Sequence, residues 1–176
     1  MTAAPPGFDD VCAAKRRISP YAVRTPLLNA PALDARIGAR VLLKLETLQR
    51  TGSFKFRGAF NALSALSDQE RARGVVAFSS GNHAQGVAEA AKILEVDATI
   101  VMPVDAPEVK KAGVVARGAQ LRLYDRETES REAIAAALCN ASGAALIPSF
   151  DHPDIIAGQG TCGLEIFEDL AEAGAA

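Results

Sequence analysis

The sequence has few of the residues that build metal sites and disulfide frameworks. Its three cysteines, Cys12, Cys139 and Cys162, are odd in number, lie far apart and match no zinc motif. The two histidines, His83 and His152, supply too few nitrogen ligands for a histidine-based metal site. We therefore predict no bound metal and no disulfide. Free thiols are most simply explained by a reducing cytoplasm.

Long apolar runs and an excess of charge of one sign are also lacking. No apolar stretch approaches the ~20 residues that a membrane-spanning helix needs. The N-terminal stretch "MTAAPPGFDDVCAAKRR" has no apolar segment of the kind found in a secretory signal. The net charge of −2 gives no electrostatic reason to expect binding to nucleic acid or to a membrane surface. Because 49% of the residues are hydrophobic, a core of normal size is expected.

From Arg40 onward, apolar runs alternate with helical patterns. Strands that alternate with helices of about 10–15 residues indicate βαβ units and a parallel sheet covered by helices on both faces. The fold class predicted is therefore α/β. Strands are predicted at 40–46, 74–80, 98–103, 119–125 and 144–150, and helices at 53–66, 82–95, 106–118, 127–140 and 155–174.

Three helix ends carry recognisable signals. Ser53 is a plausible N-cap for the helix at 53–66, and Gly118 is expected to stop the helix at 106–118. Glu127 and Glu129 are expected in the early turns of the helix at 127–140. The Ala-rich tail "AEAGAA" is expected to be a helix end.

The first 40 residues follow a different pattern. A short amphipathic helix is predicted around Asp9–Ile18, and it is followed by "SPYAVRTPLLNAPAL". Pro20, Pro26 and Pro31 predict an extended or turn-like chain there. A separate structural unit is one interpretation of this segment.

The stretch "TGSFKFRGAF" places two cations, Lys55 and Arg57, in the predicted first turn of a helix. Positive charge is disfavoured there by the helix dipole, so the pKa of Lys55 should fall and its neutral amine become available as a nucleophile. Gly52 would let a ligand approach the backbone closely. The alternative is an ordinary exposed basic pair, which is common on helix surfaces.

The stretch "FSSGNHAQG", residues 78–86, runs from a predicted strand through a small polar turn into a helix. Successive backbone N–H groups at such a point form an anion site, and Ser79, Ser80 and Asn82 add uncharged donors. A carboxylate or phosphate would suit this edge of a parallel sheet. An ordinary capped turn between strand and helix remains the alternative.

The stretch "GQGTCG", residues 158–163, formally matches a dinucleotide-binding pattern. We discount that match because no buried strand leads directly into it and no acidic residue follows at the required distance. It is interpreted as a glycine-rich lead into a helix, with Cys162 as a small residue near the helix start. His152 is interpreted as a loop-ordering residue.

Several of these segments together resemble the pyridoxal-phosphate enzymes of fold type II, in particular the threonine/serine dehydratases and serine racemases. The pairing of "SFKFRGA" with "SSGNH" is the most specific part of the resemblance. The matching segments are "RTPLL", "KLETLQRTGSFKFRGA", "SSGNHAQGVA", "ATIVMP" and "HPDIIAGQGT", in the family's order and spacing.

The resemblance implies roles for individual residues. Lys55 would form the Schiff base with the cofactor pyridoxal 5'-phosphate, and Phe54 would pack beside the cofactor ring. Asn82 would hydrogen-bond the ring hydroxyl. Ser80 would match the second acid/base of the racemases. The loop that holds the substrate carboxylate would comprise Ser79, Ser80, Gly81, Asn82 and His83.

The resemblance also implies a reaction. A hydroxy-amino acid, L-threonine or L-serine, would lose water by β-elimination and yield a 2-oxo acid and ammonia. Serine racemase-like activity is the alternative within the enzyme class. A non-catalytic α/β fragment that associates with a second polypeptide is the alternative outside it.

The family's chains are roughly twice as long as this one. By resemblance, residues 1–51 would belong to an incomplete large domain, residues 52–150 would form the small α/β domain with the cofactor lysine, and residues 151–176 would return to the large domain. We therefore expect weak or absent activity in this chain alone. A homo-oligomer, or a partner that supplies the C-terminal half, is expected to complete it.

Overall fold

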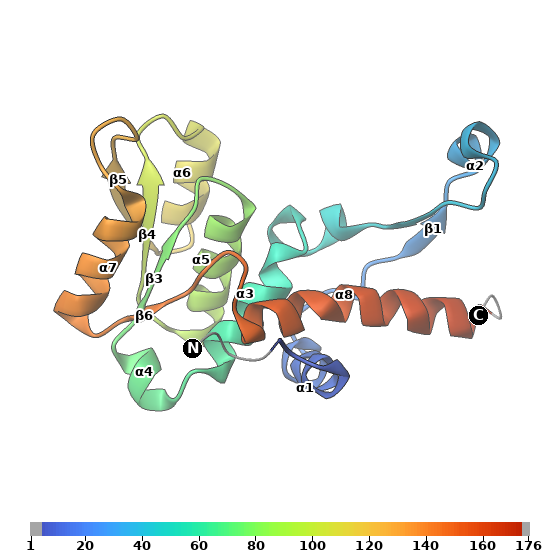
Figure 1. Cartoon of the computed structure of the whole chain (residues 1–176), viewed down its shortest axis with the longest axis horizontal. Helices are drawn as coiled ribbons and strands as arrows, with labels where there is room; N and C mark the ends of the chain where they lie inside the picture. Colours follow the sequence, from blue (N-terminus) through green and yellow to red (C-terminus); the bar gives the residue numbers. More distant parts are fainter. Residues whose placement is uncertain (1–4, 174–176) are drawn as a thin grey trace.

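Four parallel strands form the centre of the structure. The computed structural model describes residues 5–173. The strands are β3 (Val75–Phe78), β4 (Ala98–Pro103), β5 (Gln120–Tyr124) and β6 (Ala145–Leu146), in the order β5-β4-β3-β6 (Figure 1). Every pairing in this sheet is parallel. The predicted α/β fold with a parallel sheet is therefore confirmed.

Helices cover both faces of this sheet, as predicted. On one face lie α3 (Lys55–Ala65), α5 (Asn82–Leu94) and α6 (Glu108–Val115), and on the other lies α7 (Arg131–Ser142) (Figure 1). Side chains alternate between the faces because the strand period is two residues. Val75 and Ala77 join the larger core with α3 and α5, whereas Val76 packs with Ala135 of α7.

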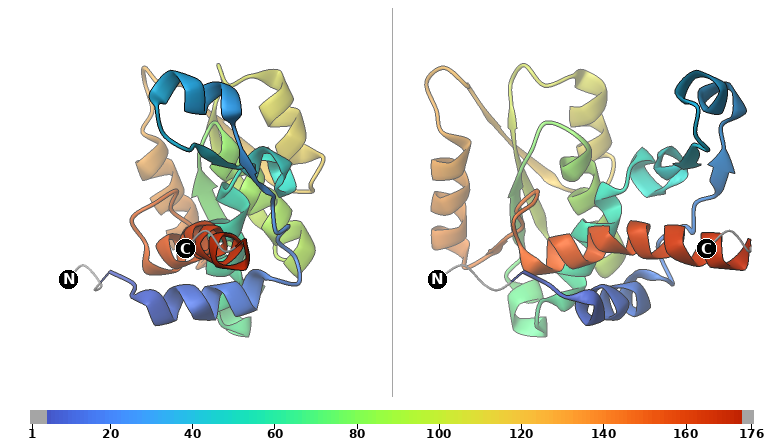
Figure 2. Two further views of the ribbon diagram at one scale, coloured as in Figure 1. Left: turned by 90° about the vertical axis from the view of Figure 1, so that its right-hand side faces the viewer. Right: turned by 45° about the vertical axis from the view of Figure 1, so that its right-hand side comes forward.

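The remaining elements lie at the edge of this layered part. The short helix α4 (Asp68–Ala72) leads into β3. The long helix α8 (Pro153–Glu172) runs away from the sheet, with α1 (Phe8–Ile18) packed against it (Figures 1 and 2). No helix of residues 5–173 is long and apolar enough to cross a membrane.

An arm projects from the rest of the molecule beside α8 (Figure 2). It is built from an antiparallel pair, β1 (Leu27–Asn29) and β2 (Leu42–Lys44), with α2 (Pro31–Ile37) between the strands. Two single-turn 3₁₀ helices, η1 (Glu46–Leu48) and η2 (Arg50–Gly52), lead from the arm to α3.

The prediction for the N-terminal segment is partly right. The helix around 9–18 is confirmed, and 27–29 is extended. The extended prediction is wrong at 31–33, where α2 begins, because Pro31 stands in the first turn of that helix and its missing N–H costs nothing there. Gly38, with a φ of 76°, ends this helix.

Two predictions about helix starts are wrong. Ser53 is not the N-cap of α3, which begins at Lys55 with Phe54 before it; the Ser53 hydroxyl is buried without a partner among residues 5–173. Glu127 and Glu129 precede α7 instead of lying in it. Ser130 caps α7 by accepting the Ala133 N–H, and Glu129 folds back to accept the N–H of Asp125 at 2.8 Å.

The helix predicted at 155–174 is confirmed as α8, but the interpretation of "GQGTCG" as a lead into it, with Cys162 near its start, is wrong. These residues lie inside α8, which starts at Pro153, and Cys162 is in mid-helix. His152 does order the loop, because it is the N-cap and its Nδ1 accepts the Asp154 N–H at 3.3 Å. The helix ends at Glu172, and residues 174–176 of the predicted tail lie outside the described part.

Gly158 lets α8 pass close to the backbone of α3. A Cβ built at Gly158 would lie 2.7 Å from the Arg57 carbonyl oxygen and 2.8 Å from the Gly58 Cα. The glycines therefore serve a close crossing of α8 and α3. This crossing holds the helix that begins with Lys55.

Candidate active site

The Lys55 side chain points to the carboxyl-terminal edge of the sheet. Its Nζ donates a hydrogen bond to the Ser149 carbonyl oxygen at 2.8 Å and lies 5.3 Å from the centre of the Phe54 ring. Burial lowers the pKa of the half-buried amine. The direction of this pKa change agrees with the prediction, and burial is its cause.

Arg57 has a different role from its neighbour in the sequence. Its side chain is 0% exposed, so the alternative of an exposed basic pair is wrong. Its guanidinium donates to both carboxylate oxygens of Glu46, from η1, and to both of Glu165, from α8, each at 2.8 Å. Burial alone would lower the pKa of Arg57, but these two carboxylates raise it above its ordinary value.

The ion pairs continue along α8 toward the arm. Glu165 also lies 3.0 Å from the Lys44 Nζ, and Lys44 donates to Asp169 at 2.8 Å. Arg24 contacts Asp169 at 2.6 Å. Sequence reasoning missed this cluster. Glu165 could have indicated it. This acidic residue lies four positions after Thr161, on the face of α8 that is buried, where a carboxylate needs a cationic partner.

The turn after β3 opens the helix α5, as predicted from "FSSGNHAQG". Ser79 Oγ accepts the Gly81 N–H at 3.2 Å, but no side chain caps the start of α5. A Cβ at Gly81 would meet no atom of residues 5–173 within 4 Å, so the backbone there is open to a ligand. This combination favours the anion-site interpretation over the ordinary capped turn.

Asn82 and His83 begin α5 and point to different surroundings. Asn82 is exposed, and its Oδ1 accepts a hydrogen bond from the Lys110 Nζ at 3.1 Å, which leaves its NH₂ group as the available donor. His83 is buried and its Nε2 lies 3.1 Å from the Ile147 carbonyl oxygen. Burial lowers the pKa of His83 to about 4, so the side chain is neutral at pH 7.

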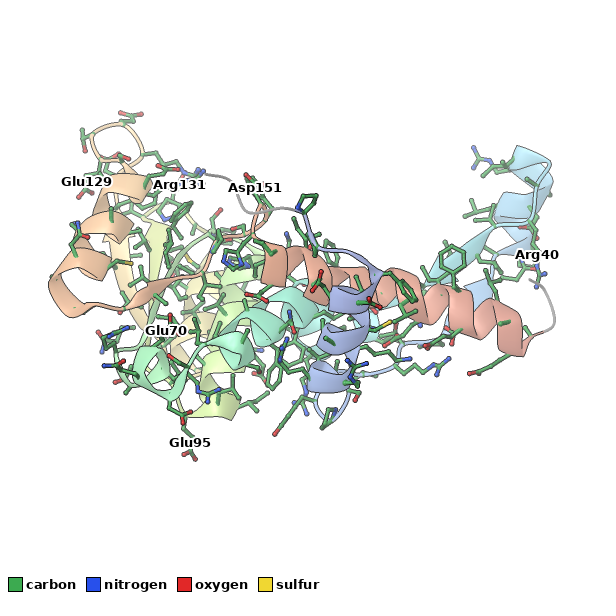
Figure 3. The ribbon with its side chains drawn as sticks, turned by 60° about the horizontal axis from the view of Figure 1, so that its bottom comes forward. Arg40, Glu70, Glu95, Glu129, Arg131 and Asp151 are labelled. Atoms are coloured by element: carbon green, nitrogen blue, oxygen red, sulfur yellow. The ribbon has the colours of Figure 1, made fainter. Side chains whose placement is uncertain are left out.

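A cleft of about 410 Å³ lies at this edge of the sheet. Ser79 and Ser80 line it from the turn after β3. Ser149, whose carbonyl oxygen accepts the hydrogen bond from Lys55, lines it from the segment after β6. Arg131 and Asp151 lie on its rim; both are labelled in Figure 3. Its full lining is Phe78, Ser79, Ser80, Arg131, Glu132, Pro148, Ser149, Phe150 and Asp151.

The structure thus brings several predicted residues to one edge of the sheet. Lys55 connects with the cleft through Ser149, while Ser79 and Ser80 line the cleft directly. The Phe54 ring is 40% exposed beside the amine. The roles assigned to individual residues by resemblance stay predictions.

Sequence reasoning missed Ser149 and Arg131 at this edge. It predicted 144–150 as strand, whereas β6 ends at Leu146 and the chain continues as a loop over the cleft. The rule that ligands bind beyond the carboxyl ends of parallel strands could have indicated Ser149. Arg131 had no comparable signal, because it lies in the first turn of α7.

Comparisons with known proteins identify a family and several relatives. The family described as pyridoxal-phosphate dependent enzyme matches residues 18–175. The L-threo-3-hydroxyaspartate ammonia-lyase of a Pseudomonas species is 55% identical over 92% of this chain and 50% of the relative. The protein of the same name from Saccharomyces cerevisiae is 52% identical, over 95% of this chain and 51% of the relative.

Solved structures give the same result. The T.th. threonine deaminase superimposes with a TM-score of 0.87 and 50% identity, over 97% of this chain and 54% of that one. Maize serine racemase superimposes with a TM-score of 0.92 and 39% identity, over 96% and 51%. The chain spans about half the length of the relatives it matches. With this match and this fold, the chain belongs to the pyridoxal-phosphate dependent enzyme family.

Proposed function

We propose that this chain carries the lysine-bearing part of the active site of a pyridoxal-phosphate dependent ammonia-lyase. The whole protein would eliminate water from a hydroxy-amino acid and release a 2-oxo acid and ammonia. The observation that carries the proposal is the Lys55 amine, held 2.8 Å from the Ser149 carbonyl at the edge of a cleft lined by Ser79 and Ser80.

The residues present fit the cofactor. A half-buried amine with a lowered pKa suits imine formation with an aldehyde, because only the neutral amine attacks. The exposed Phe54 ring offers an aromatic face within 5.3 Å of that amine. The uncapped start of α5 and the open backbone at Gly81 suit a carboxylate.

The chain's own residues would divide the work of elimination. Pyridoxal phosphate, when bound, supplies an electron sink for the carbanion at Cα. Lys55 would accept the α-proton and would pass a proton to the departing hydroxyl on Cβ, which would leave as water. The turn at 79–83 would hold the substrate carboxylate. The released enamine then hydrolyses to the 2-oxo acid and ammonia.

The choice of substrate class rests on the names of two relatives and on one cation of the cleft, whose lining also holds the carboxylates of Glu132 and Asp151. Arg131 lines the cleft, lies 5.2 Å from the centre of the Phe78 ring and pairs with Glu132 at 2.7 Å. A guanidinium on the rim would favour a substrate with a second carboxylate, because such bonds are charge-assisted. Two relatives named L-threo-3-hydroxyaspartate ammonia-lyase support this choice over L-threonine or L-serine.

The test compares substrates on the whole protein. We expect 2-oxo acid release to be faster with L-threo-3-hydroxyaspartate than with L-threonine or L-serine. Arg131→Gln should reduce kcat/KM for hydroxyaspartate about tenfold, while the value for L-threonine changes little, since one charge-assisted bond contributes ~1.5–3 kcal/mol. Arg126→Gln is the matched control, because Arg126 pairs with Asp105 away from the cleft lining. Release of ammonia from none of these substrates would contradict the proposal.

Serine racemase-like activity is the second candidate. Ser80 lines the cleft and would act as an acid/base on the face of the substrate opposite Lys55. Chiral analysis of L-serine after incubation would detect D-serine if this activity is present. Ser80→Ala should then abolish D-serine formation more strongly than elimination.

The remaining half of the site would come from the rest of the protein or from a second polypeptide. Residues 1–51 and 151–176 would pack with that half, and 52–150 would form the small domain. We propose that this chain alone binds the cofactor weakly. Restored turnover on mixing with the complementary half would support this division, whereas full activity of the chain alone would contradict it.

A further inference from the structure

His83 links the start of α5 to the segment that follows β6. It is the second residue of α5 and is 3% exposed. Its Nε2 lies 3.1 Å from the Ile147 carbonyl oxygen. Because a carbonyl oxygen can only accept, the ring proton must be on Nε2, and the neutral ring then carries a lone pair on Nδ1.

The residue that His83 contacts is itself held by the sheet. The Ile147 N–H donates to the Val76 carbonyl oxygen at 2.8 Å, so β3 holds one side of this peptide and His83 the other. Two residues further on, the Ser149 carbonyl oxygen accepts a hydrogen bond from the Lys55 amine. The path from His83 to that amine therefore crosses only the short backbone segment from Ile147 to Ser149.

The burial of His83 has a cost that packing alone does not explain. Its Nδ1 has no hydrogen-bond partner among residues 5–173. A buried unpaired polar atom is destabilising, and an apolar side chain of similar size would avoid this. The Nε2–H bond to Ile147 is the contact that an apolar side chain could not make.

The charge state of His83 also suits its place. Burial is the main reason that its pKa is lowered, and the positive charge of Lys55 lowers it further. The ring therefore stays neutral at pH 7. It can donate to a carbonyl beside Lys55 without adding a second positive charge there.

We propose that His83 is a positioning residue for Lys55: its Nε2–H holds the Ile147–Ser149 segment against α5 and so fixes the carbonyl that the Lys55 amine contacts. The catalytic meaning of this contact rests on the proposed function. The contact itself does not depend on it.

Two variants separate a positioning role from simple space filling. His83→Gln keeps an N–H donor at nearly the position of Nε2, whereas His83→Leu keeps the volume and removes the donor. A space-filling role predicts that Leu replaces His at least as well as Gln. A positioning role predicts the opposite order.

The first measurement is hydrogen exchange of the peptide spanning 147–152, without any cofactor. We expect His83→Leu to exchange at least about fivefold faster there, and His83→Gln to stay within about twofold of the original chain. The far end of α5, around Lys92, is the internal control and should be unchanged. Equal exchange in the two variants would overturn the proposal.

The second measurement is borohydride trapping of pyridoxal phosphate, with the modified lysines identified by mass spectrometry. We expect His83→Leu to lower the labelling of Lys55 relative to the exposed Lys92 about fivefold, and His83→Gln to restore it. Equal labelling in the two variants would also overturn the proposal. If Lys55 of the original chain is not labelled at all, the proposed function fails, and the exchange order still decides the role of His83.

Discussion

At the scale of single residues, the two cations Lys55 and Arg57 are both at least partly removed from solvent, but their pKa values shift in opposite directions. Lys55 keeps one carbonyl partner, and burial lowers its pKa. Arg57 is fully buried between two carboxylates and stays charged. The spacing in "SFKFRGA" therefore separates a half-buried amine with a lowered pKa from a structural guanidinium that lies on another side of the same helix.

Arg57 should be one of the most sensitive positions for stability. Arg57→Leu would leave the half-buried Glu46 and the buried Glu165 without their main partner, and breaking a buried pair costs about 3–5 kcal/mol. Urea unfolding followed by circular dichroism measures the free energy of unfolding. Arg126→Gln, at an exposed pair, is the control and should leave the midpoint almost unchanged. Similar midpoints for the two variants would contradict the structural role.

His83 should make stability depend on pH. Its pKa is about 4 when folded and ordinarily about 6.5, so the unfolded chain binds an extra proton between these values. The free energy of unfolding should therefore fall as the pH is lowered through 6.5, and the contribution of His83 is fully present above that pH. Between pH 7 and 5 the loss should be about 2 kcal/mol. Urea titrations at both pH values should show a smaller loss in His83→Gln; an equal loss would contradict this assignment.

At the scale of elements, the sequence patterns predicted where helices and strands lie better than they predicted the residues at which these elements begin and end. The strand at 98–103 was predicted with its observed bounds, because a proline and a buried apolar run define it. The starts of α3 and α7 were misplaced, since Ser53 and the glutamates before Ser130 are also reasonable cap residues. The place of the "SSGNH" turn at the edge of the sheet followed from the alternation of strands and helices. The position of Lys55 did not, because β2, the strand before α3, pairs with β1 in the arm and not with the parallel sheet. The buried contacts of Arg57 did not, because Glu46 and Glu165 lie far from it in the sequence.

Two glycines of α8 offer a matched test of the crossing with α3. A methyl group at Gly158 would overlap the α3 backbone, so Gly158→Ala should destabilise the chain by about 1–3 kcal/mol. A Cβ at Gly163 meets nothing within 4 Å, so Gly163→Ala should stabilise it by ~0.5–1 kcal/mol. Thermal unfolding compares the two variants. Destabilisation by both would count against the close crossing.

At the scale of the whole molecule, the layered α/β part and the projecting arm differ in how they are covered. The sheet is packed on both faces, whereas the arm exposes apolar side chains, among them Leu28, Leu33, Ile37 and Leu43. Arg40 marks the far end of the arm in Figure 3. Exposed apolar surface of this kind favours association with other polypeptides.

We therefore predict that the chain self-associates through this arm. Sedimentation velocity should give a weight-average mass that rises with concentration. The double variant Leu28→Glu, Ile37→Glu should lower this association, because Leu28 is 50% and Ile37 64% exposed. Val109→Glu, at an exposed residue of α6, should leave it unchanged. A monomer at every concentration would contradict the prediction.

The identity of the cofactor lysine is the central claim, and site-resolved trapping tests it most directly. The chain would be incubated with pyridoxal phosphate, reduced with borohydride and analysed peptide by peptide, with Lys55→Ala as the control. We predict that Lys55 carries the pyridoxyl group in clear excess over every other lysine and that the substitution removes this excess. Equal labelling of Lys55 and the exposed Lys92, or an unchanged pattern in Lys55→Ala, would contradict the account.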